Sequence, residues 1–132
     1  MARQLAEEGI THIFGIPGVQ LDYATNGLSK VVDDIRFIAV RHEQTATYAA
    51  DGYFRSSGRI GVGLVVPGPG LQNASAALGT AYSCSSPVLL VAGQAESYML
   101  GLDKGALHEI NDQLDIVRPI TKWCERVLSV AN

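Results

Sequence analysis

The stretch IGVGLVVPGPGLQNASAALGTAYSCS, residues 60–85, decides the fold class of this chain. Its first part, Ile60–Val66, is an almost unbroken apolar run, which is typical of a strand covered on both faces of a sheet. The turn at Pro67–Gly70 ends this strand, and Leu71–Ser85 then repeats apolar residues at helical spacing. A strand followed at once by a helix predicts parallel strand pairing through right-handed crossovers.

The same alternation of apolar runs and helical patterns continues on both sides of this stretch. Strands are predicted at Thr11–Phe14, Ile35–Val40, Val88–Ala92 and Thr121–Leu128, and helices at Val19–Ser29, Glu43–Ser57 and Ile110–Val117. We therefore expect an α/β fold, with a doubly wound, mostly parallel sheet and helices on both faces. The 132 residues suit one domain, and neither internal repeats nor a linker divide them.

The composition argues against several classes of protein. Charged residues are only 17% of the chain, against roughly 25% in an average soluble domain, so part of the surface is expected to meet another domain or subunit. A net charge of −3 without any basic run argues against a nucleic-acid partner. No apolar stretch approaches the roughly 18 residues of a membrane span, and the N-terminus reads as no secretion signal, so we expect a cytoplasmic protein without a membrane segment.

The cysteines and histidines predict no metal site. Cys84 and Cys124 form no CxxC motif, and His12, His42 and His108 lack the spacing of metal ligands. Both cysteines are expected to be small apolar core residues rather than a disulfide.

Small residues form a stripe on each of two predicted helices. Spacings of three and four residues connect Ala46, Ala49, Ala50, Tyr53 and Phe54 on one helix, and Ala74, Ala77, Leu78, Ala81 and Tyr82 on the other. Small side chains allow a neighbouring element to approach closely. The stripes either pack onto the sheet or form a helix-on-helix contact between subunits, and the sequence leaves both interpretations open.

Four turns follow the predicted strands: GIPG at Gly15–Gly18, RHEQ at Arg41–Gln44, PGPG at Pro67–Gly70, and the pair Gly93-Gln94. The carboxyl ends of parallel strands share one edge of a sheet, where ligands of such folds bind. PGPG before a helix is compatible with a phosphate loop, but it has no Lys or Ser/Thr and its prolines lack N–H groups. A rigid wall against a flat ligand suits the turn better.

Glu43 stands at the start of a predicted helix, in the turn that follows the second strand. An acidic residue in the first helical turn is ordinarily explained by the helix dipole. The apolar strand before it and the alanine stripe after it also place this carboxylate at the ligand edge of the sheet. Both interpretations stay open from the residues alone.

Six motifs, in this order, resemble one protein family. FGIPG, RHEQ, AADGY, PGPGLQN, GQ and RPITKW, spread from about Leu5 to Val127, are similar to the N-terminal pyrimidine-binding (PYR) domain of thiamine-diphosphate-dependent enzymes. The nearest group contains acetolactate synthase, oxalyl-CoA decarboxylase and benzaldehyde lyase. The resemblance implies part of a lyase, carboligase or decarboxylase that acts on 2-keto acids, acyl-CoA-type compounds or related carbonyl substrates.

The resemblance implies roles for single residues. Glu43 would hydrogen-bond atom N1′ of the cofactor's pyrimidine and favour the imino form, whose 4′-nitrogen deprotonates C2 to give the reactive ylide. Pro69 and Asn73 would line the pyrimidine, although Pro67 replaces the family's serine. Gln94 matches the glutamine of a TGQ-like turn. A polar residue of the first helical turn and an ordinary turn residue are the alternatives for Asn73 and Gln94.

Gly18, Val19 and His108 correspond to positions near the family's substrate channel. PGVQL replaces the PGGAS of acetolactate synthases, and His108 replaces a glutamine of their AFQE motif. His108 is either a proton-transfer residue or a solvent-facing loop residue. These departures leave the particular reaction open.

The resemblance also implies parts that lie outside this sequence. In the family, a separate domain with a GDG…NN motif holds the diphosphate and Mg²⁺, and neither part of that motif occurs here. FAD binds the central domain of some members, and the active site lies between the subunits of a dimer or tetramer. We therefore expect residues 1–132 to be a pyrimidine-binding domain truncated at both ends and inactive alone.

Two other functions stay open at this stage. One is a non-catalytic α/β module that binds a nucleotide or anion through PGPG. The other is a structural or regulatory remnant of the fold, which a Glu43 tolerant of any substitution would favour.

Overall fold

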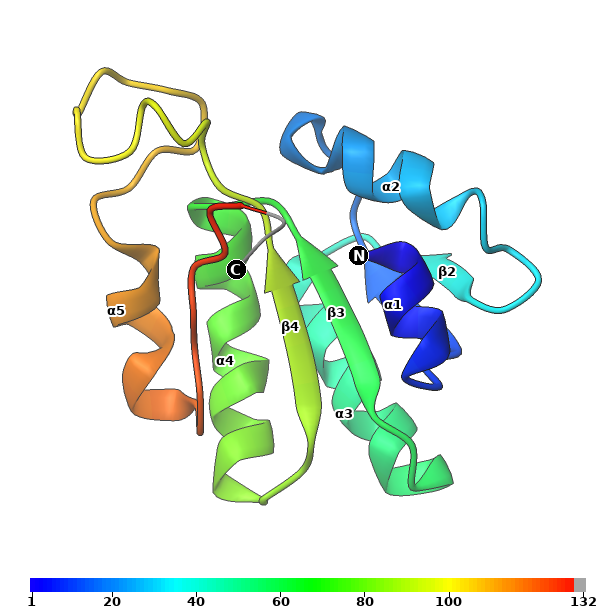
Figure 1. The fold of residues 1–132 in the computed structure, drawn as a ribbon. Helices are drawn as coiled ribbons and strands as arrows, with labels where there is room; N and C mark the ends of the chain where they lie inside the picture. Colours follow the sequence, from blue (N-terminus) through cyan, green and yellow to red (C-terminus); the bar gives the residue numbers. More distant parts are fainter. Residues whose placement is uncertain (130–132) are drawn as a thin grey trace.

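The computed structural model describes residues 1–129, in which one sheet of four strands forms the centre (Figure 1). The strands are β1 (His12–Gly15), β2 (Arg36–Ala39), β3 (Gly61–Val65) and β4 (Val88–Ala92). Their spatial order is β2-β1-β3-β4, and every neighbouring pair is parallel. The parallel pairing that the strand–helix alternation predicts is therefore confirmed, and all four strands end at the same edge.

Helices cover both faces of this sheet (Figure 1). The helical segments are α1 (Ala2–Glu7), α2 (Asp22–Leu28), α3 (Glu43–Ser57), α4 (Pro69–Ser83), α5 (Gln113–Val117) and the 3₁₀ turns η1 (Val19–Leu21) and η2 (Arg118–Ile120). α3 and α4 pack on one face, whereas α1 and α2 pack on the other, and α5 lies against α4. The described residues thus have the expected α/β architecture.

Alternate strand residues supply the two core layers. Ile13 and Leu64 point toward α1 and α2, whereas Phe14 and Val65 point toward α3 and α4. This alternation follows from the period of two residues along a strand. A third cluster, which includes Val117, joins α4 to α5. The core therefore holds α3 and α4, which begin at the strand ends, in fixed positions on the sheet.

The alanine stripes are buried inside the chain. Ala46 and Ala50 of α3 have no exposed surface, and a Cβ at Gly61 would overlap the backbone of Ala50. Ala74 and Ala77 of α4 are likewise fully buried. Close packing of α3 and α4 within the chain therefore accounts for the buried alanines of these stripes, whereas Tyr82 at the end of the second stripe is 54% exposed.

The helix starts differ from the predicted ones for local reasons. α4 begins at Pro69 because proline suits the first helical position, and Gly68, with a φ of +56°, turns the chain into it. α5 begins at Gln113 rather than at Ile110 because the side chain of Asp112 caps it by accepting a backbone N–H at 3.0 Å.

The predicted fifth strand at Thr121–Leu128 is wrong. This segment runs beside α4 and pairs with no strand among residues 1–129 (red in Figure 1). Trp123 and Val127 are largely exposed, while Cys124 packs against the α4–α5 cluster. A strand-like pattern needs a neighbouring strand to bond with, and contacts with helices decide the course of this segment instead. Cys84, expected in the core, is exposed just after α4.

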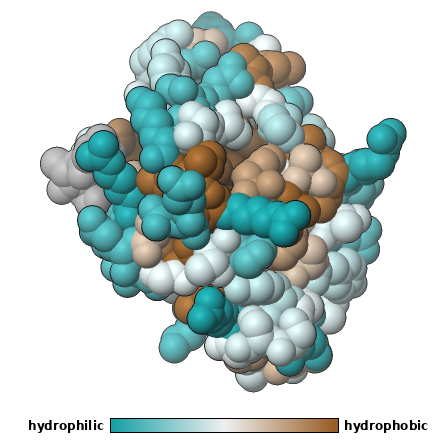
Figure 2. Space-filling view, turned by 90° about the vertical axis from the view of Figure 1, so that its right-hand side faces the viewer, coloured by the Kyte–Doolittle hydropathy of each residue, from teal (hydrophilic) through white to brown (hydrophobic). Residues whose placement is uncertain are grey.

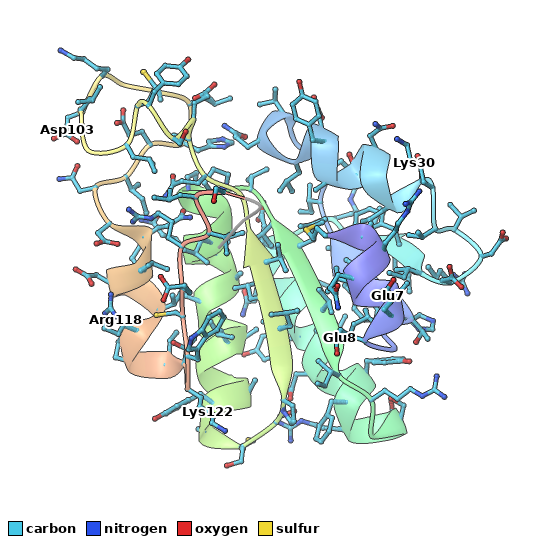
Figure 3. All side chains as sticks on the ribbon, viewed as in Figure 1. Glu7, Glu8, Lys30, Asp103, Arg118 and Lys122 are labelled. Atoms are coloured by element: carbon cyan, nitrogen blue, oxygen red, sulfur yellow. The ribbon has the colours of Figure 1, made fainter. Side chains whose placement is uncertain are left out.

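Most charged side chains lie on the outside of the fold, whereas Asp51 of α3 is buried. Figure 3 labels several of them, including Glu7 on α1, Lys30 after α2, Asp103 in the long loop after β4, and Arg118 and Lys122 beyond α5. Figure 2 shows that the face formed by α1, α2 and β2 mixes hydrophilic side chains with apolar ones near its middle. Within residues 1–129, none of the helices has the length and apolar character that crossing a membrane requires.

Candidate functional site

The turns that follow the four strands meet at one edge of the sheet, at the top of Figure 1. Backbone hydrogen bonds join neighbouring turns to this edge. The N–H of Ile16 is donated to the carbonyl of Leu64 at 3.3 Å, and the N–H of Gly93 to the carbonyl of Val65 at 3.0 Å. Side chains on different turns therefore hold fixed positions relative to one another.

Glu43 is the first residue of α3 and is half-buried. The preceding His42 caps this helix, because its Nδ1 accepts the N–H of Gln44 at 3.2 Å. Nδ2 of Asn73, on α4, donates a hydrogen bond to Oε2 of Glu43 at 3.0 Å. The structure thus joins two predicted cofactor residues, 30 residues apart in the sequence, in one contact.

The PGPG turn forms a wall beside this carboxylate. Pro69 is exposed at the first position of α4. A Cβ at Gly70 would lie 2.6 Å from Cγ2 of Val66 and 3.7 Å from Cγ of Glu43. The lack of a side chain at Gly70 therefore allows the turn to approach both the strand end and the first turn of α3.

The N–H groups of the PGPG turn are all accounted for within the fold. Pro67 and Pro69 carry none. The N–H of Gly68 is donated to Oε1 of Gln113 at 3.3 Å, and that of Gly70 to the carbonyl of Pro67 at 3.2 Å. A phosphate cradle needs such groups to point at the ligand. This geometry argues against an anion-binding module that works through PGPG.

Gln94 follows β4 and is half-buried at the same edge. Its Oε1 accepts the N–H of Ala95 at 2.8 Å, a local bond that turn residues commonly make. The preceding Gly93 packs on the PGPG turn, since a Cβ there would lie 3.1 Å from Cδ of Pro67. The turns that carry Gln94 and Pro69 are therefore direct neighbours.

The three predicted channel residues lie on two loops that touch. Gly18 and Val19 lead into η1, where Nε2 of Gln20 donates to the carbonyl of Leu107 at 3.0 Å. His108 comes next on that second loop, in the left-handed region with a φ of +64°. Val19 is 62% exposed, whereas Gly18 and His108 are half-buried.

His108 packs against the PGPG turn. A Cβ at Gly68 would overlap the carbonyl oxygen of His108. Nδ1 of the His108 ring is buried and has no hydrogen-bond partner among residues 1–129. Leaving a buried polar atom unpaired costs free energy, so this nitrogen is a candidate contact for a bound molecule. The solvent-facing interpretation does not hold for this atom.

Sequence reasoning missed Gln113, which is only 7% exposed. Its Nε2 donates to the carbonyl of Gly93 at 2.8 Å, and its Oε1 accepts the N–H of Gly68. A single side chain thus connects the turns after β3 and β4. One signal was available: Gln113 shares the helix face of Ile116 and Val117, and a polar residue within an apolar stripe needs a buried partner.

The shifted pKa values among the described residues belong to groups away from this edge, in the C-terminal half of α3 and just after α4. Burial, the largest single influence, would raise the pKa of Asp51. The hydrogen bonds from Nε of Arg55 at 2.9 and 3.0 Å, the nearby Ser86 hydroxyl and the positive charge of Arg55 together outweigh burial and hold this pKa below its usual value. The hydroxyl of Thr11, 2.8 Å from the phenol oxygen, lowers the pKa of Tyr53. Arg55 also lowers the pKa of the Cys84 thiol.

Two hollows on the described surface lie elsewhere. One of about 390 Å³ between α2 and β2 is mainly apolar, with Leu28 and Phe37 in its lining. The other, of about 1210 Å³, runs along β4 between α4 and the segment that follows α5. Glu43 and Asn73 line neither hollow. The contact between Glu43 and Asn73 therefore lies outside both hollows.

A parallel α/β sheet with a carboxylate, an asparagine and a proline–glycine wall at its strand ends defines the class of ligand-binding α/β domains. The family described as "Thiamine pyrophosphate enzyme, N-terminal TPP binding domain" matches residues 1–116, and the chain belongs to this family. The resemblance stated from the six motifs is thereby confirmed. Thiamine pyrophosphate, which is thiamine diphosphate, is the cofactor that the family's description names.

Curated relatives with several activities resemble this chain. It is 47% identical to an acetolactate synthase large subunit of Buchnera aphidicola (subspecies Schizaphis graminum), over 91% of this chain and 20% of that protein. It is 42% identical to a probable 2-ketoarginine decarboxylase of Pseudomonas aeruginosa, over 98% of this chain and 23% of that protein. It is 36% identical to 2-hydroxyacyl-CoA lyase 2 of Danio rerio, over 98% of this chain and 20% of that protein. The chain thus spans about a fifth of the length of these relatives.

Proposed function

We propose that this chain forms the pyrimidine-binding half of the active site of a thiamine-diphosphate-dependent lyase, carboligase or decarboxylase. The substrates we propose are 2-keto acids, acyl-CoA-type compounds or related carbonyl compounds. The relatives support this range, since they are named as a synthase, a decarboxylase and a lyase. The differences around Gly18, Val19 and His108 favour no single member of that range.

The hydrogen bond between Asn73 and Glu43 is the observation that carries the proposal. It holds a carboxylate at the N-terminus of α3, beside the wall made by Pro69 and Gly70. These groups fit a pyrimidine ring, because the carboxylate offers an acceptor for a ring N–H and the proline offers a flat apolar surface. Gln94, on the neighbouring turn, is proposed to contact the same ring.

The residues of this chain bind and orient the ring and move one proton. When bound, thiamine diphosphate supplies an electron sink for the breaking or making of a bond beside a carbonyl group. Oε1 of Glu43, the oxygen that Asn73 does not use, would be free to share a proton with ring atom N1′ of the cofactor. Asn73 orients the carboxylate by its bond to Oε2. An aspartate would be one methylene too short for both contacts.

The other half of the site is proposed to come from a second domain, in a dimer or tetramer. We propose that this second domain holds Mg²⁺ and the diphosphate, as the family resemblance implies. The segments after β1 and β4 carry exposed apolar side chains, including Val19, Tyr23, Tyr98 and Leu107, which favour coverage of these segments by a partner. FAD in a central domain and a cytoplasmic location stay predictions.

Substitution of Glu43 by Gln tests the proposal in the complete protein that carries this chain. The amide cannot share a proton with N1′, so we expect deuterium exchange at C2 of thiamine diphosphate and turnover to fall about a hundredfold or more. The exposed Glu7 of α1 provides the control, and Glu7→Gln should leave both rates unchanged. Normal turnover in Glu43→Gln, with the fold intact by circular dichroism, would instead favour a structural or regulatory remnant.

A further inference from the structure

We propose that Gln113 is a positioning residue, which fixes the distance between the two turns that we assign to the cofactor's pyrimidine ring. The effect of Gln113 on cofactor binding rests on the proposed function, whereas the bridge between the turns is a feature of this chain alone. Gln113 itself lies behind the turns, on α5, and is not assigned any contact with the ring.

The side chain of Gln113 bridges the turns through both of its polar atoms. Nε2 donates to the carbonyl of Gly93 at 2.8 Å, and Oε1 accepts the N–H of Gly68 at 3.3 Å. The bridge needs one donor and one acceptor at the end of a long side chain, and the glutamine amide carries both. A glutamate at this position lacks the donor, and a methionine of similar size lacks both groups.

Close packing leaves the bridged turns little room to adjust. The carbonyl oxygen of His108 occupies the space next to Gly68 where a Cβ would lie. Gly93 sits against Pro67, and its N–H is already donated to Val65 at 3.0 Å. The Gly68 N–H and the Gly93 carbonyl, which both bond to Gln113, are therefore held in place by their surroundings. The Gln113 amide connects the turns after β3 and β4 to α5.

Each bridged glycine directly precedes residues that we assign to the cofactor. Pro69 follows Gly68 and begins α4, so a shift of this turn also moves Asn73 and its bond to Glu43. Gln94 follows Gly93 on the other turn. A misplacement of about 1 Å at a site of this kind can cost about a hundredfold in rate, so the spacing of the turns matters for function.

The position of α5, which carries Gln113, is held by a helix cap and by apolar packing on α4. Asp112 caps this helix, and Val117 packs with Leu71 and Leu78 of α4. The helix is only five residues long, but its position is set by that apolar contact. The cap also supplies a matched control, because Asp112→Ala weakens the same helix without removing the amide.

The first readout is hydrogen exchange of the Gly68 N–H in the complete protein that carries this chain, without any cofactor. We expect Gln113→Met to speed this exchange at least tenfold, and Asp112→Ala to leave it within about threefold at a temperature well below unfolding. Equal effects of the two variants would reduce Gln113 to a general stabilising residue and overturn the proposal.

The second readout is the affinity of the complete protein for Mg²⁺–thiamine diphosphate, measured by calorimetric titration. We expect the Kd to rise about tenfold in Gln113→Met and to stay within twofold in Asp112→Ala. In Gln113→Glu, the loss relative to wild type should shrink as the pH falls, because a protonated carboxyl group regains a donor for Gly93. This pH profile would not arise from a merely structural role.

The outcomes separate this inference from the proposed function. An unchanged Kd in Gln113→Met, with wild type binding the cofactor normally, would overturn the positioning role alone. A wild-type protein that binds no thiamine diphosphate would overturn the proposed function and, with it, the positioning role. If Gln113→Met does not fold, Gln113→Glu provides the test, because it keeps the acceptor for the Gly68 N–H. A Kd of Gln113→Glu equal to that of wild type at neutral pH would contradict the proposal.

Discussion

Asn73 and Glu43 are joined by a hydrogen bond of 3.0 Å, which connects the fifth residue of α4 to the first residue of α3 at the edge of the sheet. Both helices start at this edge because the parallel strands before them end there. The bond therefore depends on the topology, because the parallel sheet brings the starts of the two helices close together.

Removal of the Asn73 amide should impair catalysis more than folding. A hydrogen bond to a charged group contributes about 1.5–3 kcal/mol, so we expect Asn73→Ala to lower kcat of the complete protein tenfold or more as Glu43 loses its orientation. Asn26→Ala, at an exposed position of α2, is the control and should behave like wild type. Steady-state kinetics measure kcat, and a urea unfolding curve measures the stability of each variant. An unaltered kcat in Asn73→Ala would show that Asn73 has no role in the site.

Gly68→Ala should destabilise the protein strongly. The substitution forces an alanine into a φ of +56° and drives its Cβ into the carbonyl oxygen of His108, so we expect a loss of about 2 kcal/mol or more. Gly101 has a φ of +75° but nothing within 4 Å of a Cβ, and Gly101→Ala should cost only about 1 kcal/mol. Urea unfolding measures both values, and equal losses would show that contact with His108 is unimportant.

The pair formed by Asp51 and Arg55 should make stability depend on pH in the acid range. The folded pKa of Asp51 lies below its ordinary value of 3.8, so the unfolded chain binds a proton more readily than the folded one. The contribution of this pair is therefore present above the ordinary pKa and is lost as the pH falls through the lowered folded pKa.

The variant Asp51→Asn should reveal this contribution. We expect it to be less stable than wild type near neutral pH, with a difference that narrows below about pH 4. Asp103→Asn, in the exposed loop after β4, serves as control and should follow wild type throughout. Chemical unfolding at a series of pH values provides the measurement. A gap that stays constant down to pH 2 would mean that the ion pair does not contribute in this way.

Local patterns were sufficient to locate the four strands of the sheet and to indicate their parallel pairing, whereas their spatial order came from the structure. Apolar runs such as Ile60–Val66 and alanine spacing on α3 and α4 mark strands and helices because each is a property of neighbouring residues. The segment Thr121–Leu128 has a similar pattern, but its conformation depends on whether a strand lies beside it. Among residues 1–129, none pairs with it.

The sequence by itself determined the α/β class, the turns at the strand ends and the family, because these depend on short-range spacing and on motifs in a fixed order. Only the tertiary structure decided that Asn73 contacts Glu43, that the PGPG donors are used internally and that Gln113 bridges two turns. The physical reason is that hydrogen bonds between distant residues exist only once the sheet has brought the strand ends together. The helical spacing places Gln113 on the face of Ile116 and Val117, but it does not show which backbone groups the amide will meet.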